Sequence, residues 1–308
     1  PTPRELAAWL ALHDAPDAAP AVAPDGAGAS ALLHLGGAPG APMVFLVHDI
    51  GGRASAYASM AAALVRHGYA VAALQLTGHE AHMPDSFEAL LARALAAIRQ
   101  RQPAGPYRLA GHSYGGVLAA HLAGRLEALG ERVAFLGVLD TVPPPPGEAP
   151  LAAAADPLER CMYIAAACAQ AAGARAPSFE RADFAALPDS SGRWRAIADA
   201  LAPLELWPGV DAVAELAALD RAFALLARLP APSLPLLRTA PEVWNCAAHA
   251  DDFAPAWAAS SVQPVCSHRC AGDHVSMLEG ASGAALGAAL AAAIARGDNI
   301  VELSGSID

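Results

Sequence analysis

The chain has no lysine, so all 19 of its basic residues are arginines. This absence excludes Schiff-base catalysis, serine–lysine dyads and the phosphate-binding lysine of a P-loop. Acidic residues outnumber the basic ones, with 30 Asp and Glu and a formal net charge of -11. Because nucleic acids and anionic membranes bind basic surfaces, we expect neither as a partner.

Aromatic residues and long apolar runs are also scarce. Aromatics make up 6% of the 308 residues, whereas 55% of the chain is hydrophobic, so much of the core should consist of small side chains. The longest apolar helical run, Ala284 to Ala295, is too short to span a bilayer. The five cysteines form an odd count with no secretory signal ahead of them, which favours reduced thiols in a bacterial cytoplasm.

The first thirty residues differ in composition from the rest. Residues 14–30 read DAPDAAPAVAPDGAGAS, which is typical of a linker, and the chain does not begin with methionine. We therefore expect residues 1–30 to be an N-terminal segment and linker of a longer polypeptide. Residues 31–308 should form the globular domain.

Strand and helix patterns alternate from Met43 to Asp140. Continuous apolar runs predict strands, and each of the first three is followed by helical periodicity. The predicted strands cover 43–49, 69–76, 107–112 and 132–140, and the predicted helices cover 53–68, 85–102 and 114–130. This alternation predicts an α/β fold with a mostly parallel sheet and helices on both faces.

The alternation stops after Asp140. Residues from about 143 to 241 are mostly helical in pattern, which predicts a large helical lid inserted after the strand that ends at Asp140. Strand character resumes over 242–249 and 261–270, and a final helix should cover about 280–296.

The segment GHSYG, Gly111 to Gly115, fits the pattern G-x-S-x-G at a strand-to-helix turn. In such a turn the serine is held in a strained backbone conformation with its hydroxyl above the sheet, and the glycines avoid collisions. An accidental glycine-rich turn would give the same five letters. The apolar strand before it and the unbroken helix after it favour a nucleophile at Ser113.

A serine hydroxyl needs a base and an orienting acid, which follow it in the order acid, then histidine, at strand ends of this fold. Asp140 ends the strand after Ser113, and His274 lies between the last strand and the last helix. Asp140 could instead be an aspartate in a turn, and His274 an exposed loop histidine. Their order in the chain and their positions at strand ends favour the catalytic roles. We predict an α/β-hydrolase with a Ser113–Asp140–His274 triad.

Four segments together resemble the terminal thioesterase domains of nonribosomal peptide and polyketide synthases. They are VFLVHDIGG, GPYRLAGHSYGG, VLDTVPP and GDHVSML. The resemblance covers 43–140 and 242–277, and is absent from the lid. It implies that Ser113 accepts the acyl group, that Asp140 is the acid and that His274 is the base. It also implies an oxyanion hole formed by the backbone N–H groups of Ile50 and Tyr114.

The chain departs from the family pattern at one position, and the position of the acid has an alternative. The family usually has proline after the histidine of the first strand, whereas this chain has Asp49, which would bring an extra carboxylate near the site. Many relatives of the fold carry the acid after the following strand, where Asp251 and Asp252 lie. We favour Asp140, because VLDTVPP matches the terminal-domain pattern.

Other clusters of chemically active side chains are weaker candidates. Cys266, His268, Cys270 and His274 lie within nine residues, but structural zinc usually draws on paired knuckles a dozen or more residues apart, so we expect no metal. His112 adjoins the nucleophile and could shape the pocket. Ordinary buried or solvated roles are expected for the other histidines, His48, His79, His82 and His121. Arg193 and Arg195 could meet an acidic carrier protein, or could be a solvated helix end.

The resemblance implies release of an acyl chain from the phosphopantetheine arm of an upstream carrier protein, by hydrolysis or macrocyclisation, with no cofactor in the domain itself. A stand-alone editing thioesterase and a general serine esterase share the triad. A non-catalytic binding module of the same fold would need a broken triad, whereas all three members are present.

Overall fold

A single seven-stranded sheet organises the chain in the computed structural model, which describes residues 31–304 apart from 81, 146, 149–155, 172–173, 175–176 and 188. The strand order is β1-β3-β2-β4-β5-β6-β7. β1 pairs with β3 antiparallel, and every other neighbouring pair is parallel. The strands are β1 (Ala31–Gly36), β2 (Met43–Val47), β3 (Ala70–Gln75), β4 (Tyr107–His112), β5 (Val133–Leu139), β6 (Pro241–Cys246) and β7 (Cys266–Cys270).

Apolar side chains lie on both faces of the sheet because the central strands are mostly apolar. In β2, Phe45 and Val47 belong to the core on one face, while Val44 and Leu46 belong to the core on the other. This alternation follows from the two-residue period of a strand. A strand buried on both faces must therefore read as a continuous apolar run, as β2 does.

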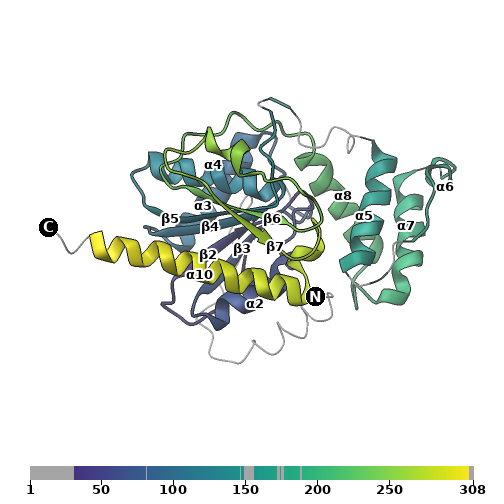
Figure 1. Ribbon diagram of the computed structural model, residues 1–308. Coiled ribbons are helices and arrows are strands. Elements are labelled where there is room, and N and C mark those ends of the chain that lie inside the picture. Colours follow the sequence, from purple (N-terminus) through teal and green to yellow (C-terminus); the bar gives the residue numbers. More distant parts are fainter. Residues whose placement is uncertain are drawn as a thin grey trace.

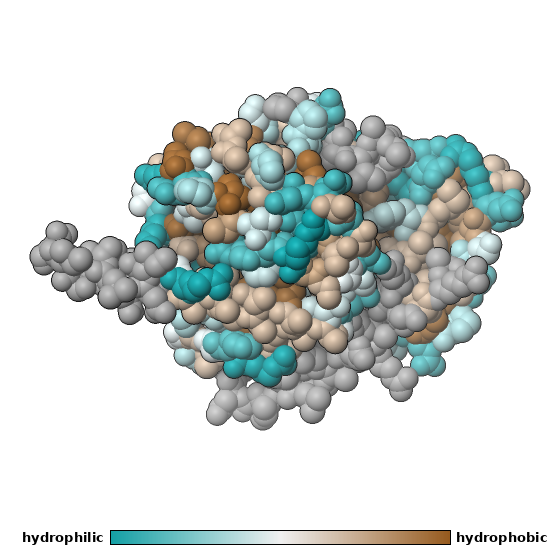
Figure 2. Space-filling view, in the orientation of Figure 1, coloured by the Kyte–Doolittle hydropathy of each residue, from teal (hydrophilic) through white to brown (hydrophobic). Residues whose placement is uncertain are grey.

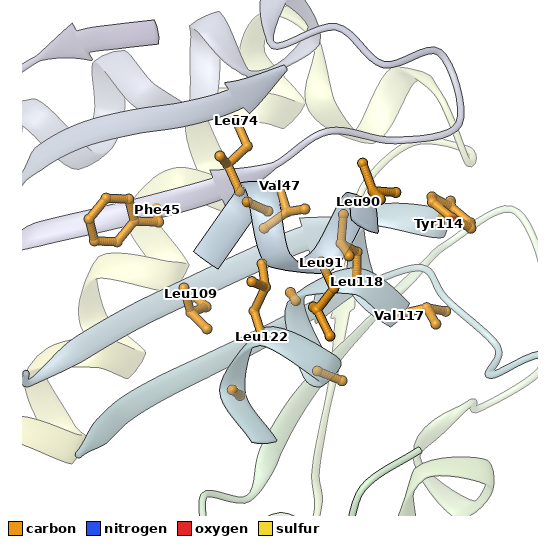
Figure 3. Packing of buried hydrophobic residues seen from close by; sticks show 14 of the residues in the cluster. Phe45, Val47, Leu74, Leu90, Leu91, Leu109, Tyr114, Val117, Leu118 and Leu122 are labelled. Atoms are coloured by element: carbon orange, nitrogen blue, oxygen red, sulfur yellow. The ribbon is translucent and has the colours of Figure 1, made fainter. Parts of the chain in front are cut away.

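Helices cover the two faces of the sheet (Figure 1). On one face α3 (Phe87–Arg101) and α4 (Tyr114–Ala128) supply the cluster shown in Figure 3, where Leu118 and Leu122 pack near Val47 and Leu109. On the other face lie α2 (Ala58–Arg66) and α10 (Gly280–Ser304), which pack against each other. The short helix α9 (Ala254–Ala258) follows β6.

Between β5 and β6, the described residues form four α-helices that stand to one side of the sheet (Figure 1). We call them the helical insertion: α5 (Pro157–Ala171), α6 (Arg181–Ala185), α7 (Ser190–Leu201) and α8 (Ala212–Leu226). The insertion has its own apolar cluster, while Phe223 and Leu226 of α8 join the core of the sheet. Glu215 of α8 pairs with Arg53 and His79 of the sheet domain, at 2.8 Å each.

The predicted fold class is confirmed: the sheet is mostly parallel, helices cover both faces, and the insertion after β5 is helical. The predicted strand over Tyr107–His112 has the observed bounds, and Ser86 caps α3 by accepting the Ala89 N–H at 3.2 Å. No helix within the described residues combines the length and hydrophobicity needed to cross a bilayer.

Several boundaries were wrong. Strand β1 was not predicted, because an antiparallel edge strand lacks the long apolar run of a central one. The last strand begins at Cys266 rather than at 261, since Ser261 forms only an isolated bridge with Leu237. β7 is an edge strand and is largely exposed. Figure 2 shows hydrophilic residues across the middle of the face of the molecule that is in view. The predicted linker, 1–30, lies outside the described residues.

Candidate active site

Ser113 lies at a sharp turn between β4 and α4, with φ 54 and ψ -128. Left-handed backbone of this kind is unusual for a residue with a side chain and signals strain at a functional site. The glycines around it are required by close contacts. A Cβ on Gly115 would lie 2.3 Å from the Val47 carbonyl oxygen, and one on Gly111 would lie 2.1 Å from the Gly115 carbonyl oxygen. The spacing of GHSYG is therefore set by sterics.

Further hydrogen bonds hold the turn and the strand ends around it. The Ser113 N–H donates to the Leu139 carbonyl oxygen at 3.0 Å. The Thr141 hydroxyl lies 2.9 Å from the Ser113 carbonyl oxygen. Tyr57 is buried, donates to the Val47 carbonyl oxygen at 2.5 Å and accepts the His112 N–H at 3.0 Å. The ends of β2, β4 and β5 are thus tied together beneath Ser113.

Asp140 and His274 are hydrogen-bonded across two parallel strands. The register pairs Leu139 of β5 with Trp244 of β6, so the loops after β5, β6 and β7 meet at one edge of the sheet. There His274 Nδ1 lies 2.7 Å from Asp140 Oδ2. The Asp140 side chain is 2% exposed and that of His274 is 47% exposed. A buried carboxylate thus orients a ring that remains open to solvent.

The Asp140 carboxylate is stabilised in its ionised form. Burial by itself would raise its pKa, but hydrogen bonds from His274 and from the Cys246 N–H, at 2.9 Å, hold the pKa well below its usual range. A second imidazole, that of His249, lies with Nε2 2.9 Å from Asp140 Oδ1. The carboxylate is therefore charged at neutral pH and can stabilise a cationic His274.

The loop that carries His274 is fixed from both sides. Asp273 Oδ1 accepts the N–H groups of Val275 and Ser276 at 3.0 and 2.8 Å. On the other side, His112 Nε2 lies 2.6 Å from the His274 carbonyl oxygen, and the two rings are 4.5 Å apart between centroids. Burial lowers the pKa of His112 to about 3, so the ring is neutral and donates from Nε2.

A cavity of about 400 Å³ opens over these residues. Its lining is mostly apolar and comes from the ends of the strands, from α4 and from the loops after β5, β6 and β7. The lining residues are Ile50, Ser113, Tyr114, Val117, Asp140, Thr141, Val142, Pro144, His249, Phe253 and His274. Among the residues that the structure describes, none of the insertion helices lines this cavity. Ser113 and His274 both line this cavity. Among the hydrogen bonds of the described residues, none joins the Ser113 hydroxyl to the His274 ring.

The loop after β2 brings Ile50 to the same cavity as Tyr114. Tyr114 is the first residue of α4, whose N–H has no acceptor within the helix. Asp49 precedes Ile50 and accepts the Gly51 N–H at 2.8 Å through Oδ1. Burial raises the pKa of Asp49, although the Gly51 N–H and the charge of His274 oppose the rise. The predicted extra carboxylate therefore does lie within electrostatic reach of His274.

Comparison with known proteins identifies the family. The family model described as "Thioesterase domain" matches residues 42–292. The chain belongs to this family. The match supports a hydrolase, and it spans strands β2 to β7 together with the helical insertion.

The similar proteins include a synthetase and a synthase component that are much longer than this chain. This thioesterase domain is 39% identical over 105 residues to vanchrobactin synthetase VabF of Vibrio anguillarum. The matched stretch covers 33% of this chain and 4% of that relative. It is also 60% identical over 50 residues to enterobactin synthase component F of Escherichia coli K12. That stretch covers 16% of this chain and 4% of the relative. The chain thus spans only a small part of these relatives.

Solved structures show the same fold. The Vlm2 thioesterase domain has a TM-score of 0.60 at 22% identity, over 85% of this chain and 97% of that one. The four-domain nonribosomal peptide synthetase AB3403, bound to AMP and glycine, has a TM-score of 0.69 at 20% identity, over 85% of this chain and 20% of that one. The α/β-hydrolase-like fold of this thioesterase domain is therefore shown by structure as well as by sequence.

The structure does not bring the alternative acids to His274. Asp252 Oδ1 accepts the Ala254 N–H at 3.0 Å, the Ser267 hydroxyl at 2.8 Å and the Asn245 side-chain N–H at 3.1 Å. Asp251 is exposed. Asp252 thus ties the loop after β6 to β7 and caps α9, whereas Asp140 faces the histidine.

The clustered cysteines and histidines of β7 do not converge on a metal site. His268 stacks on Trp244 at 4.1 Å and bonds to Glu242 at 2.8 Å. Among the described residues, the one group of His, Cys, Asp or Glu side chains compact enough for a metal is Asp140, Cys246 and His249, with ligand atoms within 4.8 Å. Asp140 and His249 are already hydrogen-bonded there, and burial raises the pKa of the Cys246 thiol.

The other predicted residues have ordinary surroundings. His48 and His121 are buried, His79 pairs with Glu215, and His82 is exposed. His112 does not line the cavity, contrary to the suggestion that it shapes the pocket, because its ring turns toward the His274 main chain. Arg193 donates to the Phe184 carbonyl oxygen at 3.2 Å, while Arg195 is exposed.

Sequence reasoning missed His249. Its only signal was its place at the end of the predicted strand 242–249, next to the position where this fold often carries the acid. A histidine at that position has no assigned role in the G-x-S-x-G pattern, and only the packing of β5 against β6 brings it to Asp140.

Proposed function

We propose that this thioesterase domain releases an acyl chain from a carrier protein through an ester with Ser113. The observation that carries the proposal is the contact of 2.7 Å between His274 Nδ1 and Asp140 Oδ2, in the same cavity as a strained Ser113. A histidine held by a buried carboxylate beside a half-buried serine is the arrangement that activates a serine hydroxyl.

In the first half-reaction, His274 Nε2 takes the proton of Ser113 as Oγ bonds to the thioester carbonyl carbon. Asp140 keeps the ring orientation and stabilises the imidazolium. The N–H groups of Ile50 and Tyr114 would bind the oxyanion, each worth on the order of 3 kcal/mol. Collapse of the intermediate breaks the C–S bond. The leaving thiolate then takes the proton from His274, which leaves an acyl-Ser113 ester.

In the second half-reaction, His274 removes a proton from the attacking group, and the same steps run in reverse to free Ser113. Water gives a carboxylic acid, whereas an amine or hydroxyl of the chain itself gives a macrocycle. The mostly apolar cavity lining favours an acyl group that is uncharged next to the ester.

The partner in this proposal is an upstream acyl or peptidyl carrier domain whose phosphopantetheine arm presents the thioester. Support comes from the family and from relatives named as a vanchrobactin synthetase and an enterobactin synthase component. The exposed Arg195 is a contact we propose for an acidic carrier surface. We place the reaction in the bacterial cytoplasm, where free cysteines such as the five of this chain stay reduced.

Intact-protein mass spectrometry tests the proposal. The protein is offered acyl thioesters on a carrier domain and, in parallel, the matching simple esters. We expect an acyl adduct on Ser113 that is absent from Ser113→Ala, and faster turnover of the carrier thioester than of the ester. Equal turnover of both would favour a general esterase. Failure of a fluorophosphonate to label Ser113 would instead favour a non-catalytic binding module. The mass of the released product distinguishes an acid from a ring.

A further inference from the structure

His249 contacts the same carboxylate as His274. Asp140 Oδ2 accepts from His274 Nδ1, while Oδ1 lies 2.9 Å from both the Cys246 N–H nitrogen and His249 Nε2. One buried carboxylate therefore has three donors, and two of them are imidazoles. A Ser-His-Asp triad requires only one imidazole hydrogen-bonded to its carboxylate.

The His249 ring is held in this position by its neighbours. It lies against the Phe253 ring, 4.7 Å between centroids and 33° between planes. The His249 carbonyl oxygen accepts from Arg269 Nη1 of β7 at 2.6 Å. The ring also lines the cavity that contains Ser113, and its side chain is 30% exposed. These contacts fix Nε2 toward Asp140 rather than leaving a surface histidine that meets it by chance.

The tautomer follows from the hydrogen bonds. An ionised carboxylate only accepts, so His249 Nε2 must carry a proton. Nδ1 of the same ring is buried and has no partner within the described residues. Leaving a ring nitrogen unsatisfied is unfavourable, and the contact with Asp140 is the interaction that offsets it in this orientation.

We infer that His249 is a positioning residue of the triad: it fixes the Asp140 carboxylate and weakens its pull on the proton of His274. The inference rests on the proposed function of Ser113, Asp140 and His274. A carboxylate that accepts three hydrogen bonds is a weaker base than one that accepts two. The proton of a cationic His274 is therefore held less tightly and is returned more readily to the leaving group.

The charged groups around His249 determine in which direction its removal shifts the pH dependence of Ser113 labelling. His249 lies next to Asp140 after β5, Cys246 at the end of β6 and Arg269 on β7. It shares the Asp140 carboxylate with His274, which follows β7. Asp251 and Asp252 follow on its own loop. Removal of the His249 donor leaves Asp140 with more uncompensated charge next to His274. The acidic limb of the pH profile for Ser113 labelling should therefore move to higher pH.

The test measures the rate at which a fluorophosphonate labels Ser113 as a function of pH, because this rate reports serine activation without the natural substrate. His249→Phe keeps an aromatic ring against Phe253 and removes the donor. His249→Gln places an amide N–H near the position of Nε2. We expect the Phe variant to lower the limiting rate roughly tenfold and to move the acidic limb upward by roughly half a pH unit. In the Gln variant, the acidic limb of the labelling profile should return to the pH that it has in the unmodified protein.

A matched control is His268→Phe. His268 is also a histidine bonded to a carboxylate, Glu242, and stacked on a ring, Trp244, but it does not touch Asp140. We expect its labelling profile to equal that of the unmodified protein. An acidic limb that stays in place in His249→Phe, or moves equally in both Phe variants, overturns the inference. An absence of labelling in the unmodified protein contradicts the proposed function instead.

Discussion

His112 and His274 are joined by a hydrogen bond from the ring of one to the main chain of the other, Nε2 to carbonyl oxygen at 2.6 Å. The two residues are 162 positions apart in sequence. The residue before Ser113 thus holds the loop of His274, so the strand that positions the proposed nucleophile also positions the proposed base.

The first prediction follows from this contact. His112→Leu should lower kcat by roughly tenfold to a hundredfold, because small displacements of a catalytic group are costly. His112→Gln should retain most activity, since its amide can donate near the position of Nε2. Steady-state kinetics with a carrier thioester measures both. Equal losses in the two variants, accompanied by equal losses in thermal stability, would show that His112 only fills space.

The second prediction concerns the acid. Asp140→Asn should lower kcat by roughly three to four orders of magnitude, because the His274 tautomer is no longer fixed. Asp252→Asn should keep activity within roughly threefold and lower the free energy of unfolding by about 1–2 kcal/mol, since it weakens the contacts to Asn245 and Ser267. Kinetics and urea denaturation check the two variants. Loss of activity in Asp252→Asn with full activity in Asp140→Asn would reverse the assignment.

The third prediction concerns Asp49. Once ionised, this carboxylate favours the cationic form of His274. Asp49→Asn removes the charge and keeps an oxygen that can accept the Gly51 N–H, so the acidic limb of kcat/KM should move to lower pH. Asp49→Ala also loses the acceptor and should lower kcat further. Measurement of kcat/KM between pH 5 and pH 9 separates the two effects, and superimposable profiles for all three proteins would rule out a role for Asp49.

The fourth prediction is the pH dependence of stability. His121 is buried against Phe87, with ring centroids 4.8 Å apart, and burial lowers its pKa from 6.5 to about 4. Since the unfolded chain binds this proton more readily, stability is fully present above pH 6.5 and is lost as pH falls toward 4. The loss from this group is up to about 1.4 kcal/mol per pH unit.

His121→Leu removes this contribution. Its free energy of unfolding should therefore fall less steeply than that of the unmodified protein between pH 6.5 and pH 4. Urea denaturation at several pH values measures the difference. If the curves of the two proteins run parallel through this range, His121 does not carry the effect.

The sequence by itself determined the features that depend on neighbouring residues. The period of apolar positions identified the parallel sheet, and GHSYG at a strand-to-helix junction predicted the strained turn at Ser113. Both follow from local sterics and from burial on two faces, which a continuous stretch of sequence records directly. Strand β1 escaped prediction because an edge strand carries a weaker form of the same pattern.

Only the tertiary structure decided which side chains meet. Asp140 contacts His249 and His274, which are 109 and 134 positions away in sequence, while Asp252 bonds to Asn245 instead. These contacts depend on the register of β5, β6 and β7 and on the conformations of the loops that follow them. A single sequence gives the order of these residues along the chain. The distances between them follow from the packing of strands that are far apart in that order.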